Sequence, residues 1–285
     1  MIGETLTQAS RQLTEAGIPA ARREAEELLA AIVGCEPLEV YLTPEVTAEQ
    51  RRQFWQWTAA RIRHIPTQYL TGRVRFYGLE FVVTPATLIP RPESELLVEV
   101  ACAQMTRRWS PSTALRVVDV GTGCGNLTVS LTKQRPSATL VAIDRSCAAL
   151  VVARWNATRL GVADRVRILQ SDGLTGMTRE WAPHLIVANP PYVSSGEWAT
   201  LPPEVRQEPR LALDGGADGL RVHAAWIAQA SERLRVGGCL VLELGAGQEA
   251  AVRVLVAQTA TLRVVDVRDD WQGIPRVLVA ERWTN

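Results

Sequence analysis

Two patterns of apolar residues follow one another along the chain. In the first third they recur at helical spacing, as on the face formed by Leu28, Leu29, Ile32 and Val33. We expect one helix from Pro19 to Val33 and another from Thr47 to about His64, since Gly34 and Pro66 each stop a helix. Residues 1–66 are therefore predicted to form a small helical N-terminal domain.

From Gln68 onward strand-forming residues replace the helical pattern. They surround Tyr77-Gly78, a pair typical of a hairpin turn, and comprise Val74, Phe76, Leu79, Phe81 and Val83. The run Ile89-Pro90-Arg91-Pro92 comes next, and its prolines exclude a regular helix or a central strand. We therefore assign residues 67–90 to a β-hairpin linker and place a domain boundary near this run.

After Leu115 short apolar runs alternate with longer helical stretches. The runs are typical of buried parallel strands: Leu115–Val120, Ala138–Ile143, Val166–Leu169, Leu185–Ala188 and Cys239–Leu244. Segments such as Cys147–Leu160 and Arg221–Leu234 have a helical pattern. Only a loop joins the last two strands, Leu262–Val267 and Arg276–Ala280, which indicates antiparallel pairing. The order predicts an α/β fold over residues 91–285, with a doubly wound sheet of seven mostly parallel strands.

Composition narrows the class of protein. The 285 residues suit one standard domain plus a smaller one, and 47% are hydrophobic, enough for a substantial core. The five cysteines form no Cys-x-x-Cys pair and the three histidines are scattered, so we expect neither disulfides nor a metal site. No signal-peptide pattern and no apolar run of membrane-spanning length is present, which predicts a soluble, cytoplasmic protein without membrane contact.

A glycine loop follows the first predicted parallel strand. Its sequence is Gly121-Thr122-Gly123-Cys124-Gly125, and glycines permit a tight turn and close approach of a ligand. Asp144 ends the next strand, where an acid can hold ribose hydroxyls. A dinucleotide would require Gly-x-Gly-x-x-Gly instead. Asp119, just before the loop, would repel a pyrophosphate but attract the positively charged end of S-adenosylmethionine, so this cofactor fits better.

The motif Asn189-Pro190-Pro191-Tyr192 follows the strand Leu185–Ala188, at the edge where open α/β sheets bind ligands. An amide or aromatic amine nitrogen is a poor nucleophile because its lone pair is delocalised, so an enzyme must hold the NH₂ group between two acceptors. Asn189 can supply a side-chain carbonyl, Pro190 a main-chain carbonyl of fixed direction, and Tyr192 a flat face. These three are the predicted catalytic residues of a methyl transfer to a planar nitrogen.

The residues alone leave the target of this chemistry open. An enzyme that methylates adenine or guanine in nucleic acid would use the same motif, but would favour a basic surface. The net charge is only +1, and the basic pairs Arg22-Arg23 and Arg51-Arg52 are offset by nearby glutamates. A non-catalytic adaptor is a further alternative, which would need neither the glycine loop nor the tetrapeptide.

The chain resembles the PrmC/HemK family of release factor glutamine methyltransferases over almost its full length. Besides the glycine loop, Asp144 and the Asn-Pro-Pro-Tyr motif, the matching segments are Gln68–Gly72, Phe76–Leu79, Thr87–Glu95, Glu208–Gly216 and Asp218–Leu220. The Pro-Arg-Pro stretch and the Glu-Pro segment are more specific than the tetrapeptide, which many amino-methyltransferases share. The resemblance therefore favours a protein target over a nucleobase.

The resemblance implies a class I, Rossmann-like methyltransferase that converts S-adenosylmethionine to S-adenosylhomocysteine. The methyl group would go to the side-chain amide nitrogen of the glutamine in the Gly-Gly-Gln motif of peptide chain release factors, with no direct nucleic-acid partner. Residues Gly121 to Gly125, Asp144 and Asn189 would bind the cofactor. Asn189, Pro190, Pro191 and Tyr192 would bind the glutamine, and the helical domain would help to hold the release factor.

The chain departs from the family pattern at one position near the expected cofactor. Family members often carry an aromatic residue just after the acid that follows the third strand, where it stacks near adenine. Here Asp172 is followed by Gly173, so adenine packing would either be weaker or come from elsewhere, with Leu174 as a candidate. Asp172 could still hold the adenine amino group, and both residues stay in the predicted cofactor site.

Two further family segments have structural interpretations. Asp270 to Arg276 keeps the family's Asp, Gly and Arg with an unusual Pro275, and is expected to form a turn before the last strand. Arg91 is expected either to order the loop over the cofactor or to be a solvated arginine.

Overall fold

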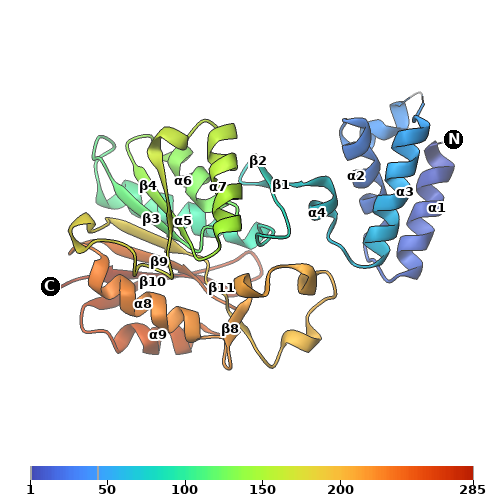
Figure 1. Cartoon of the computed structure of the whole chain (residues 1–285). Coiled ribbons are helices and arrows are strands. Elements are labelled where there is room, and N and C mark those ends of the chain that lie inside the picture. The colour runs from blue at the N-terminus through green and yellow to red at the C-terminus, as the bar shows by residue number, and fades with distance from the viewer. Residues whose placement is uncertain (1, 44, 285) are drawn as a thin grey trace. The chain divides into compact units, whose positions relative to one another are not determined.

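The computed structural model describes residues 2–43 and 45–284, which form two compact units. Among these residues, the first unit contains those up to Arg73 together with Pro202–Gln207, and the second contains Val74–Leu201 and residues 208–284. Figure 1 draws most of the first unit in blue and the second in green to red. Within the described ranges every helix is too short or too polar to span a lipid bilayer.

The first unit is built from helices around an apolar core. Helices α1 (Ile2–Glu15), α2 (Ala21–Val33) and α3 (Ala48–Ile62) contribute most of its buried apolar side chains, and α4 (Thr67–Thr71) follows them. Helix α2 ends at Gly34, whose φ of 80° suits glycine, and Thr47 caps α3 by accepting a hydrogen bond from Gln50 N–H. These ends agree with the stop and start signals in the sequence.

The second unit contains a seven-stranded sheet in the order β10-β11-β9-β6-β3-β4-β5. Its strands are β3 (Arg116–Val120), β4 (Thr139–Asp144), β5 (Val166–Gln170), β6 (Leu185–Ala188), β9 (Cys239–Glu243), β10 (Leu262–Asp269) and β11 (Pro275–Arg282). The first five are parallel to one another, whereas β10 and β11 pair antiparallel. The predicted mostly parallel sheet and its antiparallel last pair are confirmed.

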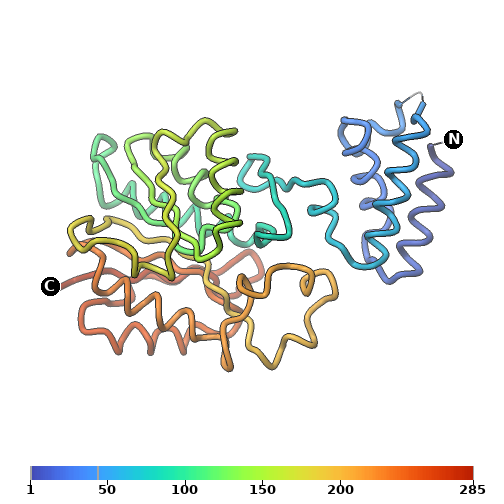
Figure 2. The backbone as a smooth tube through the Cα atoms, in the orientation of Figure 1, coloured from blue at the N-terminus to red at the C-terminus, as the bar shows by residue number. Residues whose placement is uncertain are grey.

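Helices cover both faces of this sheet, as Figures 1 and 2 show. Helices α5 (Glu95–Arg108), α6 (Asn126–Gln134) and α7 (Cys147–Arg159) pack on one face, and α8 (Arg221–Arg233) and α9 (Glu249–Ala257) on the other. Alternate residues of one strand therefore enter different cores: Val117 lies in the first and Val118 in the second. Burial on both faces explains why these strands read as continuous apolar runs.

Two short ladders lie outside the main sheet. Strands β1 (Arg73–Phe76) and β2 (Leu79–Val82) form the predicted hairpin, with both turn residues, Tyr77 and Gly78, at positive φ. The parallel pair β7 (Val193–Ser194) and β8 (Asp214–Gly216) was not predicted. It pairs Asp214 and Gly216 with Val193 and Ser194, which directly follow the Asn-Pro-Pro-Tyr motif.

Asn156 of α7 joins the hairpin to the glycine loop. Its side chain is fully buried and exchanges two hydrogen bonds of 2.8 Å with the main chain of Val82. The same amide nitrogen donates to the carbonyl oxygen of Cys124, at 2.9 Å. One side chain therefore satisfies main-chain groups of two segments that are far apart in sequence.

Replacing Asn156 with alanine should lower the free energy of unfolding by about 2–4 kcal/mol, because buried main-chain groups of Val82 and Cys124 lose their partners. Urea denaturation followed by circular dichroism measures this change. Thr158→Ala is the matched control: it lies on the exposed side of the same helix and should change stability by less than about 0.5 kcal/mol. Equal effects of the two substitutions would contradict the proposed role of Asn156.

Candidate active site

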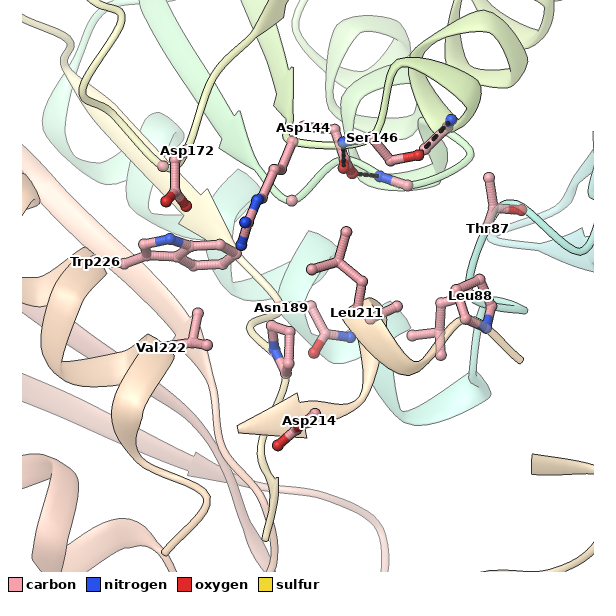
Figure 3. Close-up of a pocket in the computed structure, with 18 of the residues that line it drawn as sticks. Thr87, Leu88, Asp144, Ser146, Asp172, Asn189, Leu211, Asp214, Val222 and Trp226 are labelled. Atoms are coloured by element: carbon pink, nitrogen blue, oxygen red, sulfur yellow. Dashed lines mark hydrogen bonds between the residues drawn. The ribbon is translucent and has the colours of Figure 1, made fainter. Parts of the chain in front are cut away.

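A cavity of about 290 Å³ opens at the carboxyl ends of the parallel strands, close to the lower end of the usual size of small-molecule sites. Seven residues that the sequence assigned to the site line it: Gly121, Gly123, Asp144, Asp172, Gly173, Asn189 and Pro191. Helix α8 and the segment around Pro209–Asp214 complete the wall (Figure 3). The fold thus brings together residues that follow four different strands.

The other five assigned residues lie outside the cavity wall. Thr122, Cys124 and Pro190 are buried behind it. Gly125 packs against α7, since a Cβ added there would lie 3.2 Å from Ala153 Cα. The Tyr192 ring lies beside Gly245, at the end of β9, and burial raises the pKa of its hydroxyl to about 12.

The glycine loop turns sharply after β3. Gly121, Gly123 and Gly125 all have positive φ, which side chains disfavour. The N–H groups of Gly121 and Thr122 both donate to the carbonyl oxygen of Ile143, at 2.8 Å, which ties the loop to the end of β4. The loop conformation therefore explains the choice of glycine.

Asp119 lies beneath this loop and not in the cavity wall. Its Oδ2 accepts hydrogen bonds from the Thr122 hydroxyl and from the hydroxyl and N–H of Thr128, at 2.7 to 3.1 Å. Complete burial raises the pKa of this carboxyl to about 6, against the effect of these bonds. The sequence suggested a direct approach to the cofactor, whereas the structure shows that Asp119 fastens the loop to α6.

Asp144 presents a fixed carboxylate to the cavity. Its Oδ2 accepts a hydrogen bond from Gly123 N–H at 2.9 Å, and its Oδ1 accepts one from Ser146 N–H at 2.8 Å. Burial raises its pKa, and these backbone donors oppose that rise. Each oxygen keeps acceptor capacity, as recognition of a ribose diol requires.

Asn189 is held by a buried chain of hydrogen bonds that the sequence analysis missed. Its Nδ2 donates to Ser94 Oγ at 3.1 Å, and the Ser94 hydroxyl donates to Glu243 Oε2 at 2.6 Å. Ser94 and Glu243 are both buried. A hydroxyl has one proton, so a Ser94 that donates to Glu243 can only accept from Asn189. The chain thereby leaves Asn189 Oδ1 free to accept a hydrogen bond from a target NH₂ group.

The buried carboxylate of Glu208 joins two segments that line the cavity. Glu208 Oε2 accepts a hydrogen bond from Ile89 N–H at 2.9 Å, and its Oε1 pairs with Arg91. Leu88 and Leu211, from the segments on either side of this pair, both line the cavity (Figure 3). Of the two expectations for Arg91, the structure supports the one in which it orders the loop at the site.

The C-terminal motif is a turn, as expected. Asp270 Oδ1 accepts hydrogen bonds from the N–H groups of Gln272 and Ile274, and Oδ2 accepts from Arg276.

No group of three or more His, Cys, Asp or Glu side chains within residues 2–43 and 45–284 is arranged to hold a metal ion.

These residues fit S-adenosylmethionine. Asp144 offers acceptors for the ribose hydroxyls, and the loop from Gly121 lets the ligand approach the main chain. Gly173 also lines the cavity, and a Cβ added there would collide with Gln229 and Trp226, so the absence of a side chain lets α8 lie against this loop. The cavity therefore provides a place for a polar nucleoside next to Asn189.

The fold and this cavity together define a class I methyltransferase, whose methyl donor is S-adenosylmethionine. The structure is similar to the ribosomal protein L11 methylase of Lactobacillus delbrueckii subsp. bulgaricus, with a TM-score of 0.51, 17% identity, and coverage of 71% of this chain and 84% of that chain. It is also similar to the hMettl16 catalytic domain, with a TM-score of 0.56, 15% identity, and coverage of 84% and 83%. At these identities the likeness concerns the fold.

The chain belongs to the release factor glutamine methyltransferase family. Residues 4–72 match the PrmC N-terminal domain, and residues 94–201 match the methyltransferase small domain. The release factor glutamine methyltransferase of Moorella thermoacetica is 40% identical over 281 residues, which cover 98% of each chain. That of Gloeobacter violaceus is 40% identical over 263 residues, which cover 91% of this chain and 90% of the relative.

Turnover should depend on the protonation of Glu243, because burial raises the pKa of this carboxyl to about 7. Above that pH the carboxylate can only accept from Ser94, which orients Asn189. Below it a protonated Glu243 can donate to Ser94, and the orientation of Asn189 is no longer enforced. We expect kcat to fall as the pH is lowered through about 7.

The control is Glu243→Gln, which keeps an oxygen acceptor for Ser94 at every pH. Its profile of kcat against pH should lack the acidic limb near neutrality. An unchanged limb in this variant would assign the titration to another group, such as the carboxyl of Asp119.

Proposed function

We propose that this protein transfers the methyl group of S-adenosylmethionine to the side-chain amide nitrogen of the glutamine in the Gly-Gly-Gln motif of peptide chain release factors. The observation that carries the proposal is the match over 98% of both chains to a relative named release factor glutamine methyltransferase. The arrangement of Asn189 supports it, because a free Oδ1 suits an amide NH₂ group.

In this proposal the cofactor is bound by the glycine loop, Asp144, Asp172 and Gly173. Gly121 and Gly123 let it approach the main chain, and Asp144 holds its ribose. Of the loop's other residues, Thr122, Cys124 and Gly125 act by maintaining the conformation of the loop, since they lie outside the cavity wall.

The glutamine is bound by the segment Asn189 to Tyr192. Asn189 Oδ1 accepts one N–H group of the amide, and Pro191 confines its plane from the cavity wall. Pro190 and Tyr192 lie outside the wall of the cofactor cavity, so we assign the second acceptor, the main-chain oxygen of Pro190, and the Tyr192 ring to a glutamine that enters beside that cavity. Held in this way, the lone pair of the nitrogen is directed at the methyl group. When bound, S-adenosylmethionine supplies an electrophilic methyl group. The amide nitrogen would release one proton to water as it receives that methyl group.

We assign residues 1–66 to release factor binding, residues 67–90 to a hairpin linker and residues 91–285 to catalysis. The turn Pro37–Leu42 supports the first assignment, because Leu38 and Leu42 are 78% and 82% exposed there, as in a surface that contacts another protein. A cytoplasmic location belongs to the same proposal, since release factors act at the ribosome.

A nucleobase target is less well supported. It would use the same four residues, but the relatives that match this chain over nearly its full length are named for a protein substrate. The net charge of +1 also gives no general attraction to nucleic acid.

The direct test incubates the protein with methyl-labelled S-adenosylmethionine and either a release factor, DNA or RNA. Label should appear on the release factor, and should be absent when the glutamine of its Gly-Gly-Gln motif is replaced with alanine. Label on nucleic acid alone would refute the proposal.

Asn189→Ala should reduce turnover by ~10²-fold or more, the scale of losing one preorganised polar contact, while binding of the cofactor remains measurable. Steady-state kinetics and calorimetry separate these effects. Gln272→Ala, which removes an amide side chain from an exposed turn, is the control and should keep near-normal turnover. Comparable turnover in the Asn189 and Gln272 variants would disprove the role of Asn189.

A further inference from the structure

Trp226 is the one aromatic side chain among the described residues that line the cavity. It projects from α8 into the site, between Asp172 and Asn189 (Figure 3). Val222, one turn earlier on the helix, lines the same wall. The indole is partly buried. Neighbouring residues therefore hold the ring in place, while part of its surface stays accessible to a ligand.

Two glycines make room for this indole. A Cβ added to Gly121 would lie 2.7 Å from Trp226 Cη2, which is closer than real contacts allow. A Cβ added to Gly173 would lie 2.9 Å from both Trp226 Cδ1 and Nε1, and would also collide with Gln229 Oε1. The six-membered ring thus meets the loop after β3, while the five-membered ring meets the loop after β5.

The helix that carries Trp226 is fastened to the loop after β5. Gln229 lies on α8, one turn beyond Trp226, and its Oε1 accepts a hydrogen bond of 2.6 Å from Leu174 N–H. Ile227 of α8 is buried in the core beneath the sheet. These contacts fix the helix, so the indole is positioned before any ligand arrives, with few rotatable bonds of its own.

We propose that Trp226 is the wall on which the adenine base of S-adenosylmethionine stacks, and that Gly121 and Gly173 leave the room that the indole needs to lie there. The proposal rests on the proposed function, since it takes this cavity as the cofactor site. Trp226 on α8 then provides the aromatic surface that members of the family often provide with the residue at position 173, which is a glycine in this chain. An apolar planar face next to the carboxylate of Asp172 suits a planar base that bears an amino group.

The order of the strands indicates that the base, and not another part of the cofactor, lies against Trp226. Asn189 follows β6, the glycine loop follows β3, Asp144 ends β4 and Gly173 follows β5, and these strands are neighbours in that order. The methyl group must lie near Asn189 and the ribose near Asp144. The base, which is bonded directly to the ribose, then extends toward Gly173, where the five-membered ring of Trp226 lies.

Calorimetry with S-adenosylhomocysteine tests the proposal in the full-length protein. Trp226→Leu keeps apolar volume but removes the flat ring, and should raise Kd roughly tenfold or more, the scale of one lost base–aromatic stack. Trp226→Phe keeps a smaller ring and should raise Kd only a few-fold. Adenosine, used as a competing ligand, should lose affinity in parallel. Trp271→Leu is the control, because Trp271 is 82% exposed in a turn and should not affect Kd.

A fluorescence titration keeps the test valid if Trp226→Leu does not fold. Stacking of a base on an indole changes the emission of that indole, so S-adenosylhomocysteine should change the emission of the wild-type protein. The change should largely disappear in Trp226→Phe, although calorimetry still detects binding. An equal change in both proteins would overturn the proposal.

Three other results would also overturn it. The first is an unchanged Kd for S-adenosylhomocysteine in a folded Trp226→Leu. The second is weaker binding of S-adenosylmethionine but not of S-adenosylhomocysteine, which would place the indole against the sulfonium cation. The third is an unchanged cofactor Kd with a raised KM for the release factor, which would place Trp226 in the protein-substrate site. Because cofactor binding is measured without a release factor, a wild-type protein that binds but does not methylate would refute the proposed function alone.

Discussion

Parallel pairing of β6, β3, β4 and β5 is the constraint on which the site depends. It places the carboxyl ends of four strands at one edge, so residues separated by long stretches of sequence face the same cavity. The order of the strands also sets the order of the functional groups along that edge, from the amide of Asn189 to the carboxylate of Asp144 and then to Gly173, against which Trp226 packs. Helices on both faces keep the sheet buried, which makes this edge the place where polar main-chain groups and ligands can meet.

Within that frame, buried polar side chains decide which way the functional groups point. Glu243 and Ser94 orient the Asn189 amide, and Asp119 fastens the glycine loop from below. Each buried carboxylate is paired with donors, because an isolated buried charge would be strongly unfavourable. The result is that the acceptors facing the cavity are fixed in direction before substrate binds, which lowers the cost of orienting a weak nucleophile.

The sequence predicted the main sheet well because strands buried on both faces leave uninterrupted apolar runs, and it located Asp144 and Asn189 because each directly follows such a run. It missed the β7–β8 pair, whose strands are short and partly made of glycine. It also missed Ser94, Glu243 and Trp226. Their roles arise from contacts across the fold: Ser94 and Glu243 are 149 residues apart in sequence, and helical periodicity does not indicate that Trp226 faces two distant glycines. Asp119 was expected to face the ligand because its depth beneath the loop cannot be read from its position in the chain.

The shared bonds of Asn156 couple ligand binding to the stability of a distant hairpin. Its side chain forms hydrogen bonds with the main chain of Val82 in β2 and of Cys124 in the glycine loop. Because both segments share Asn156 as their partner, separating either one from α7 disturbs the hydrogen bonds of the other. A ligand that binds only the ordered loop therefore stabilises the hairpin by mass action, although it does not touch it. In terms of amide hydrogen exchange, the residues around Val82 and the glycine loop form one opening unit, and cofactor should slow exchange in both.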